Sequence, residues 1–479
     1  MMRSRVPLAA GCTVLLLVLG LPISTGLLAQ GATSPVGQTD QGATLRRRAV
    51  WHGMIAPVGG DSGALVHRIE SSSPAARAGL RERDRLVAIN GTPVLEADAF
   101  WPAFRSLRGG DTVRARVVRG RAGADTVELR FALDSAAHEQ IPGTFTTYGA
   151  VRSDRGYLLR TVVSRPEHPA AARVPGVLFI PWLSCDPVEK PDPGNDGFAH
   201  MLRALATGSG MVVMRVEKPG LGDSQGPDCS KGGLDDELAA PRAGLRALRS
   251  MPQVDPSRIF IMGGSIGGGL APIIAAAEPQ GVAGIVAVSG FTRTWYEHML
   301  DIERRRLTLS GSSPADVNSA MRGFAQFYTD YLLGGKTPAQ VLDVRPELRP
   351  LWYDEPTRQY GRPAAYYQAV ARLDVEAAWA AVAAKGIPAL VVWGEYDWIM
   401  SRAEAERAVE IVNTRRPGLA QLVVLPKTDH SLMVYASVAD AFADGRATND
   451  GAAGRAITAW LRQQAGRTDR AATEASRGQ

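Results

Sequence analysis

The sequence is poor in the patterns that hold metals, nucleotides and nucleic acids. It contains no spaced set of metal ligands, no phosphate-binding glycine loop and no dinucleotide fingerprint after a first strand. Its net charge is +6, but the basic residues are scattered, and no long basic run is interleaved with aromatic side chains. We therefore expect no metal, no cofactor and no nucleic-acid partner, which leaves chemistry that side chains perform alone.

Cysteine is also scarce, with three residues in a chain of 479. Cys12 lies in an apolar stretch, residues 7–29, that follows Arg3 and Arg5, the layout of a secretory signal peptide with cleavage near Ala29 or Ala32. This layout predicts a periplasmic or secreted protein. The alternative is an uncleaved anchor in the inner membrane, because the stretch approaches the length that spans a bilayer. A polar linker, residues 30–47, follows the signal segment.

Three short segments in the second half of the chain each close an apolar run. They span residues 263–267, 394–397 and 428–430 and contain Ser265, Asp397 and His430 in that order. A serine hydroxyl is a weak nucleophile until a histidine accepts its proton and a carboxylate holds that histidine in the required tautomer. We predict that these three residues form one catalytic triad.

The pattern G-x-S-x-G occurs twice, at Ser265 and at Ser224, so the pattern alone does not identify the nucleophile. Ser265 follows the apolar run 258–262 and precedes a predicted helix over 270–277, which gives the strand, sharp turn and helix of a nucleophile elbow. Ser224 follows a glycine-rich loop and precedes Pro227, which does not lead from an elbow into a helix. We therefore predict that Ser265 is the nucleophile and that Ser224 is a polar turn residue.

The acid and the base are chosen by their position after buried strands. Asp397 follows the run 389–393, and the carboxyl ends of parallel strands are where α/β sheets place their ligands. The alternative for Asp397 is a helix N-cap, and Glu395 is the reserve acid. Of the seven histidines, only His430 directly follows a strand, 421–425, downstream of the acid. Its neighbour Asp429 is read as a loop residue, since adjacent side chains point apart.

Together these features resemble the α/β-hydrolase superfamily, whose members carry serine, acid and histidine in this chain order. The resemblance covers residues 140–466 and implies a mostly parallel central sheet flanked by helices, with a helical cap inserted at about 291–385. It also implies an oxyanion hole formed by the N–H of Ile266 and by that of Leu183 or Trp182, which follow the strand 174–180.

The same resemblance places two cysteine-bearing loops side by side. Cys185 follows the strand 174–180 and Cys229 follows the next strand, and these strands are neighbours in the superfamily's order. The resemblance thus implies a disulfide that holds the oxyanion loop, in keeping with export. The alternative is two unpaired buried thiols.

A second resemblance lies before the hydrolase-like region. The helix-like Ser73 to Leu80 and the hairpin-like Asp84 to Val94 together resemble a bacterial PDZ domain, over residues 48–135. Such domains bind extended peptide ends at a sheet edge. The resemblance implies that the loop Trp51-His52-Gly53-Met54 receives a peptide carboxylate. The alternative is a domain that only orients the hydrolase.

Two segments depart from the strand and helix rhythm. The expected cap is rich in aromatic residues and contains Arg304-Arg305-Arg306, which we interpret as a solvated helix face rather than a site for an acidic substrate group. The polar residues 467–479 are expected to form a disordered tail.

The sequence therefore predicts an exported serine hydrolase that cleaves carboxylic esters through an acyl-enzyme. One alternative is a serine peptidase of the prolyl-aminopeptidase or acylaminoacyl-peptidase type, in which the PDZ domain captures peptides. Another is a peptide-binding adaptor without activity. The expected partners are a small ester or peptide substrate and, at the PDZ domain, a peptide C-terminus.

Overall fold

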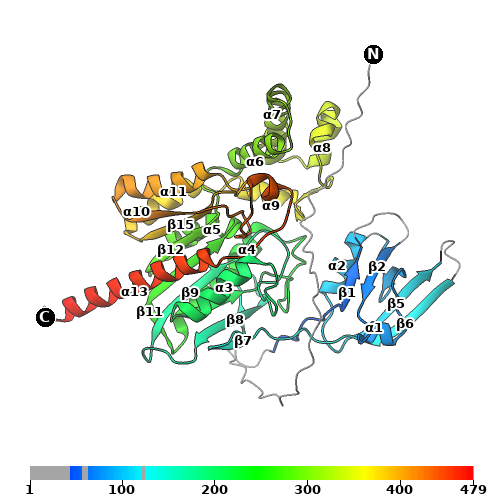
Figure 1. Cartoon of the computed structure of the whole chain (residues 1–479), viewed down its shortest axis with the longest axis horizontal. Coiled ribbons are helices and arrows are strands. Elements are labelled where there is room, and N and C mark those ends of the chain that lie inside the picture. The colour runs from blue at the N-terminus through cyan, green and yellow to red at the C-terminus, as the bar shows by residue number, and fades with distance from the viewer. Residues whose placement is uncertain (1–43, 57–62, 96, 121–124, 478–479) are drawn as a thin grey trace.

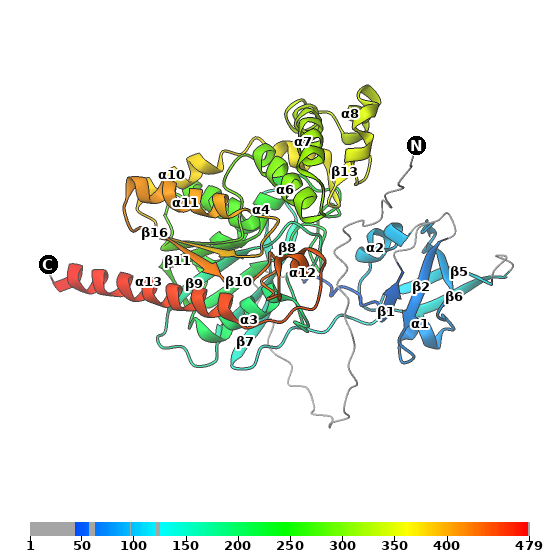
Figure 2. The ribbon, with the colours of Figure 1, turned by 45° about the horizontal axis from the view of Figure 1, so that its top comes forward.

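The computed structural model describes residues 44–56, 63–95, 97–120 and 125–477. The predicted signal peptide and most of the linker lie outside these residues. Figures 1 and 2 show a small β-rich domain beside a larger domain in which helices cover both faces of a sheet. Among the described residues, no helix is long and apolar enough to cross a membrane.

The small domain is built on an antiparallel sheet with the order β1-β2-β3-β5-β6, and β4 pairs with β3. Its core contains Leu86 of β3 and Phe100 and Phe104 of α2. Its elements are β1 (Gly53–Ile55), β2 (Ala64–Ile69), α1 (Pro74–Arg77), β3 (Arg85–Ile89), β4 (Thr92–Pro93), α2 (Ala97–Arg105), β5 (Thr112–Arg119) and β6 (Asp125–Ala132).

The large domain has an eight-stranded sheet with the order β16-β15-β12-β11-β9-β10-β8-β7. The strands from β16 to β10 are parallel, whereas β7 and β8 pair antiparallel at one edge. The strands are β7 (Thr144–Arg152), β8 (Leu158–Pro166), β9 (Val174–Ile180), β10 (Val212–Val216), β11 (Val254–Gly264), β12 (Gly284–Val288), β15 (Ala389–Gly394) and β16 (Ala420–Leu425). The predicted fold, mostly parallel with flanking helices, is confirmed.

Alternation along the central strands gives each face of the sheet its own core. In β9, Val177 and Phe179 point to one face and Leu178 points to the other. The first face packs against α3 (Gly197–Gly208) and α13 (Ala452–Arg477), and the second packs against α4 (Leu234–Ser250), α5 (Ile266–Ala277), α10 (Val375–Lys385) and α11 (Arg402–Arg415). Both faces are buried, which explains the nearly continuous apolar runs of these strands.

A mostly helical cap follows β12 and lies over one end of the sheet (Figures 1 and 2). Its elements are α6 (Trp295–Leu309), α7 (Pro314–Tyr328), η1 (Thr329–Leu333), α8 (Pro338–Val344), η2 (Pro346–Leu351), β13 (Arg358–Gln359), β14 (Arg362–Pro363) and α9 (Ala364–Val370). The cap was predicted to continue to residue 385, but its last element is α9. The next helix, α10, packs against α5 and α11 and buries Trp379 and Val382 in the sheet's core.

The chain also differs from expectation near its C-terminus. The segment 467–479 is expected to be a disordered tail, but α13 continues to Arg477. Alanine and arginine are strong helix formers, so the sequence after Gln463 extends a helix already anchored by Ile457 and Leu461 in the core. The short helix α12 (Val438–Phe442) precedes α13.

The two domains are joined by a buried set of ion pairs at the segment that enters the small domain. Arg47 pairs with Asp223 at 3.0 Å and with Glu189 at 2.5 Å. Arg48 pairs with Glu189 at 3.0 Å, and Arg160 pairs with Asp223 at 2.9 Å. Side chains of the large domain thus hold the chain where it leaves the linker.

Candidate active site

Ser265 stands at a sharp turn between β11 and α5. Its φ of 56° and ψ of −125° are rare for a residue with a side chain, and such backbone strain costs about 1–3 kcal/mol. Its N–H donates to the Val288 carbonyl at 2.9 Å. A Cβ on Gly263 would overlap Gly267, and a Cβ on Gly267 would overlap the Ile180 carbonyl, so only glycine fits at both positions. This strand, turn and helix presents the serine at the end of the sheet.

His430 lies between the serine and an aspartate. Its Nε2 is 2.9 Å from Ser265 Oγ, and its Nδ1 is 3.0 Å from Asp397 Oδ2. The three residues follow the carboxyl ends of the parallel strands β11, β15 and β16, which share one edge of the sheet. The structure therefore brings together the serine, histidine and aspartate that the sequence singles out.

Asp397 is held rigidly by its loop. One oxygen, Oδ1, accepts the N–H groups of Ile399 at 3.0 Å and Met400 at 2.8 Å, which leaves Oδ2 for the histidine. Its side chain is fully buried. The N-cap of α11 is Ser401 rather than Asp397. The reserve acid Glu395 accepts the N–H of Lys427 at 2.8 Å.

The charges around His430 raise its pKa, so its imidazole holds a proton more tightly than a free histidine does in water. Burial alone would lower the pKa of His430, but the charge and hydrogen bond of Asp397, together with the charge of Asp429, outweigh it and raise the pKa above its usual 6.5. Burial raises the pKa of Asp429 to about 6, against the opposing hydrogen bond from the Met433 N–H. A base must be neutral to accept a proton, so activity that uses His430 should rise with pH through this raised pKa.

The loop after β9 lies directly beside the elbow. A Cβ on Gly267 would come within 2.7 Å of the Pro181 carbonyl, so Trp182 and Leu183 follow immediately from a point of contact with the first turn of α5. Ile266 is the first residue of α5, where N–H groups have no partner within the helix. The two sides of the predicted oxyanion hole therefore come from adjoining segments.

A disulfide joins Cys185 to Cys229, with the two Cα atoms 5.7 Å apart. The bond links the loop after β9 to the loop after β10, and these strands are neighbours in the sheet. The cap reaches the same place, because the Arg362 Nη1 atom of β14 lies 2.6 Å from the Cys229 sulfur.

Ser224, the serine of the second G-x-S-x-G segment, is buried and makes its hydrogen bonds with the backbone. The Ser224 hydroxyl accepts the Arg160 N–H at 2.9 Å and donates to the Glu217 carbonyl at 3.2 Å. Ser224 is only 2% exposed to solvent. The Ser224 hydroxyl thus links the backbone of β8 to the residue that follows β10.

Two residues of the cap helix α6, Arg305 and His298, were not predicted to belong to the site. They contact the loop 395–401 that carries Asp397, here called the acid loop, or the helix α11 that follows it. Arg305 donates to the carbonyls of Trp398 at 2.7 Å and Ile399 at 2.6 Å, so its side chain does not belong to a solvated helix face as expected. The buried His298 lies 3.1 Å from Glu404, at the start of α11. A charged residue on a cap helix gives no local signal of such a contact, because its partners lie about a hundred residues away.

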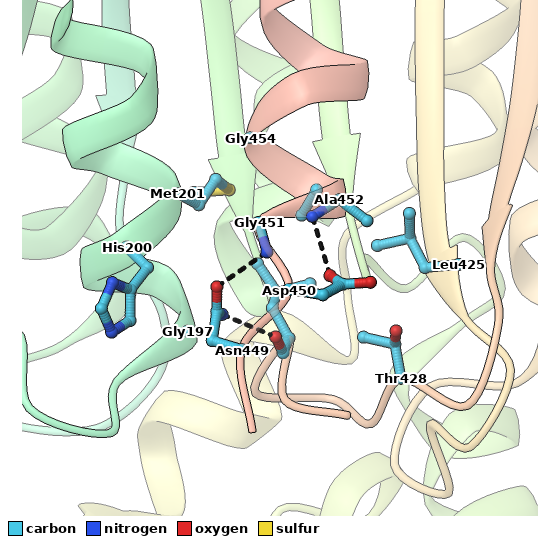
Figure 3. Close-up of a pocket in the computed structure, with 12 residues that line it drawn as sticks. Gly197, His200, Met201, Leu425, Thr428, Asn449, Asp450, Gly451, Ala452 and Gly454 are labelled. Atoms are coloured by element: carbon cyan, nitrogen blue, oxygen red, sulfur yellow. Dashed lines mark hydrogen bonds between the residues drawn. The ribbon is translucent and has the colours of Figure 1, made fainter. Parts of the chain in front are cut away.

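A small pocket lies behind the histidine loop, between α3 and the start of α13 (Figure 3). Asn449 donates to the Leu432 carbonyl at 3.2 Å, and its own oxygen accepts the Gly451 N–H at 3.0 Å. Thr428 and Leu432, which flank the His430 turn, line this pocket, but none of the three triad candidates does. The contacts at the pocket therefore brace the histidine loop from behind.

In the small domain, the residues of the predicted peptide loop are engaged with their own domain. Trp51 packs edge-on against Phe100 of α2, with ring centroids 5.0 Å apart. His52 Nε2 lies 3.0 Å from Asp134. Gly53 and Met54 lie in the edge strand β1. Peptide binding by Trp51 to Met54 stays a prediction.

Metal ligands are not gathered anywhere in the described part of the chain. No group of three or more histidine, cysteine, aspartate or glutamate side chains there is arranged to hold an ion.

Both regions match known protein families. Residues 196–434 match the model described as serine aminopeptidase, S33, and residues 44–130 match the PDZ domain model. No curated protein matches the sequence significantly.

Several solved structures are similar to the chain at low identity. Est1E from Butyrivibrio proteoclasticus, with bound ferulic acid, is 17% identical with a TM-score of 0.41, over 66% of this chain and 96% of that one. The esterase domain of a Rhodothermus marinus protein is 17% identical with a TM-score of 0.39, over 67% and 98%. Carboxyl esterase 2 from the mycorrhizal fungus Tuber melanosporum is 12% identical with a TM-score of 0.39, over 69% and 89%.

Proposed function

The chain belongs to the α/β-hydrolase superfamily of serine hydrolases and carries an N-terminal PDZ domain, and on this basis we propose that it cleaves carboxylic esters with Ser265, His430 and Asp397. The observation that supports this most is the pair of contacts made by His430, at 2.9 Å to the serine and 3.0 Å to the aspartate. This is the geometry that a base needs to activate a hydroxyl.

In the proposed mechanism, His430 Nε2 accepts the proton as Ser265 Oγ attacks the ester carbonyl. The tetrahedral oxyanion is stabilised by the N–H of Ile266 and by that of Leu183 or Trp182. The proton then passes from His430 to the leaving alcohol, and the C–O bond breaks to give the acyl-enzyme. Water, deprotonated by His430, releases the acid and restores the serine. Asp397 keeps Nδ1 protonated throughout and stabilises the imidazolium.

The charges inside the domain favour an uncharged ester over a peptide with a free amino terminus. An aminopeptidase needs a carboxylate to receive the substrate's ammonium group. Among the buried glutamates around the sheet and the cap, Glu237 pairs with Lys218 and Arg362, Glu303 with Arg306, and Glu404 with His298. A further one, Glu217, accepts the backbone N–H groups of Val188 and Lys218. Taking Glu237 away from Lys218 and Arg362 would leave two buried cations without their partner, which is costly.

A peptidase is the second candidate, because the matched family model is described as serine aminopeptidase and the chain carries a PDZ domain. The two are separated by comparing p-nitrophenyl acyl esters with aminoacyl p-nitroanilides under the same conditions. We expect turnover of the esters to exceed that of the anilides by more than the ratio of their intrinsic reactivities. Preferential cleavage of the anilides would replace the esterase with the peptidase, and no turnover of either would favour the adaptor.

We also propose that the protein acts outside the cytoplasm, in the periplasm or after secretion. The disulfide between Cys185 and Cys229 supports an oxidising compartment. The signal-like segment lies outside the described residues, and an uncleaved anchor is the alternative. The mass of the purified mature protein would distinguish a cleaved from an uncleaved N-terminus.

A further inference from the structure

Lys218 is a buried lysine that follows β10 and reaches under the loop after β9. Its side chain is 3% exposed. The ammonium group donates to the carbonyl of Trp182, lies 3.2 Å from that of Leu183 and 3.4 Å from that of Ser184, and pairs with Glu237 at 2.9 Å. Burying a lysine is costly unless its charge is paired and its donors are used, so this set of acceptors explains why it is tolerated.

The carbonyls that Lys218 binds fix the direction of the N–H groups on the same peptide planes. In a planar trans peptide the C=O and the following N–H point in opposite directions. Because the Trp182 carbonyl points to Lys218, the Leu183 N–H points away from it. The Trp182 N–H lies on the preceding peptide, whose carbonyl Lys218 does not bind.

The order of the strands in the sheet determines which residues lie across the end of β9 from Lys218. Strand β9 stands between β11, which ends at the elbow, and β10, which leads into Lys218 (Figure 2). Lys218 and Ser265 therefore flank the end of β9 from opposite sides. An N–H that points away from Lys218 at this place points toward the side of Ser265.

We propose that Lys218 is a positioning residue that orients the Leu183 N–H as the second oxyanion donor of the reaction at Ser265. The inference rests on the proposed acyl transfer and extends it by resolving the choice between Leu183 and Trp182. Lys218 does not touch the reacting atoms itself; it acts through the peptide between Trp182 and Leu183.

The cap takes part in this arrangement through one ion pair. Arg362 of β14 lies 2.6 Å from Glu237, and its guanidinium stacks 4.2 Å over the Tyr366 ring. Glu237 is thereby fixed between the cap's arginine and Lys218. The cap therefore supports the oxyanion loop from the side opposite the elbow.

The test is Lys218→Met, which keeps the length of the side chain but removes the donor. Its matched control is Lys190→Met, because Lys190 belongs to the same loop and lies over the Trp182 ring at 5.4 Å, with its charge on Asp196. We expect Lys218→Met to lower kcat for a p-nitrophenyl ester about 100-fold, close to the loss of one oxyanion donor. KM should change less than about threefold, because the proposed donor stabilises the transition state rather than the bound ester. Lys190→Met should leave kcat and KM within about threefold of wild type, because the Lys190 amine pairs with Asp196.

Affinity for a trifluoromethyl ketone separates positioning from general damage. This inhibitor forms a hemiketal oxyanion on the serine, so its binding should weaken in Lys218→Met by about the same factor as kcat. If Lys218→Met does not fold, as judged by its thermal transition, Lys218→Arg replaces it, with kcat and ketone affinity expected to fall together at constant KM. An unchanged kcat, or a fall in kcat without loss of ketone affinity, would overturn the proposal. Absence of ester turnover in the wild type would instead remove the proposed function.

Discussion

The two serines in G-x-S-x-G segments show how the same five-residue pattern can serve opposite purposes. At Ser265 the serine takes a positive φ of 56°, while Gly263 lies near the end of strand β11 and Gly267 lies in helix α5. At Ser224 the flanking residues Gly222 and Gly226 take positive φ values, 54° and 118°. In the first segment the glycines make room for a strained serine, and in the second they form turns around a relaxed one.

Each serine is also associated with a buried aspartate, and the two aspartates differ in what they hold. Asp397 contacts His430, which contacts Ser265. Asp223, the neighbour of Ser224, pairs with Arg47 and Arg160 and so ties the incoming linker to the hydrolase domain. We therefore expect the chemistry at the first segment, whereas the second segment holds the start of the small domain against the large one.

Asp397→Asn should give the largest effect on the rate. The amide would turn an N–H toward His430 or leave its Nδ1 without a strong acceptor, which favours the wrong tautomer, and the expected loss in kcat is about 10⁴-fold. Steady-state kinetics with a p-nitrophenyl ester measure this. Glu395→Gln is the matched control and should lose less than about threefold, because Glu395 accepts only a backbone N–H. Equal losses in the two variants would make Glu395 a partner in catalysis.

Asp223→Asn should affect stability rather than rate. The Arg47 charge and the backbone N–H of Arg48 outweigh the effect of burial and hold the pKa of Asp223 below its usual 3.8. Removing its charge leaves two buried guanidinium groups short of a partner, with an expected loss of about 3 kcal/mol in the free energy of unfolding.

The stability that Asp223 contributes has a defined pH dependence. Because its pKa is depressed in the folded state, the contribution is complete above the unfolded pKa and is lost as the pH falls through the folded pKa. Urea unfolding at pH 7 and at pH 3 should therefore show a smaller difference between Asp223→Asn and wild type at the lower pH. If Asp223→Asn lowered kcat at temperatures well below its unfolding transition, the Ser224 segment would affect the reaction as well as stability. That result would contradict the different roles expected for the two serine segments.

Asp429→Asn should give the smallest change, a shift in the pH profile. The charge of Asp429 helps to raise the pKa of His430, although less than Asp397 does. Without that charge the pKa of His430 falls, so the acidic limb of kcat/KM should move to lower pH by a fraction of a unit. The amide can still accept the Met433 N–H, which Asp429 accepts at 2.8 Å, so the loop should be preserved. A shift to higher pH would contradict the charge assignment.

The sequence predicts best where the signal is local. The apolar run 174–180 coincides with β9, and the strands before Ser265, Asp397 and His430 are found close to their predicted bounds. A buried parallel strand requires apolar residues on both faces, so its sequence is distinctive. The order serine, acid, histidine then points to residues that the sheet's edge brings within hydrogen-bond distance.

Contacts between distant polar residues could not be predicted in the same way. Nothing in the neighbourhood of Lys218 shows that its amine lies under the carbonyls of residues 182–184, and nothing near Arg305 shows that it holds the acid loop. These contacts depend on how the cap and loops pack over the sheet. The same reason explains the misplaced cap boundary, because α10 looks like a cap helix in sequence but packs on the sheet in space.

Labelling with a fluorophosphonate probe, followed by mass spectrometry of the modified peptide, tests most directly whether Ser265 is the nucleophile. We expect one modified residue, Ser265, in the wild-type protein and in Ser224→Ala, and no labelling in Ser265→Ala. Labelling that persists in Ser265→Ala, or that disappears in a folded Ser224→Ala variant, would contradict this expectation.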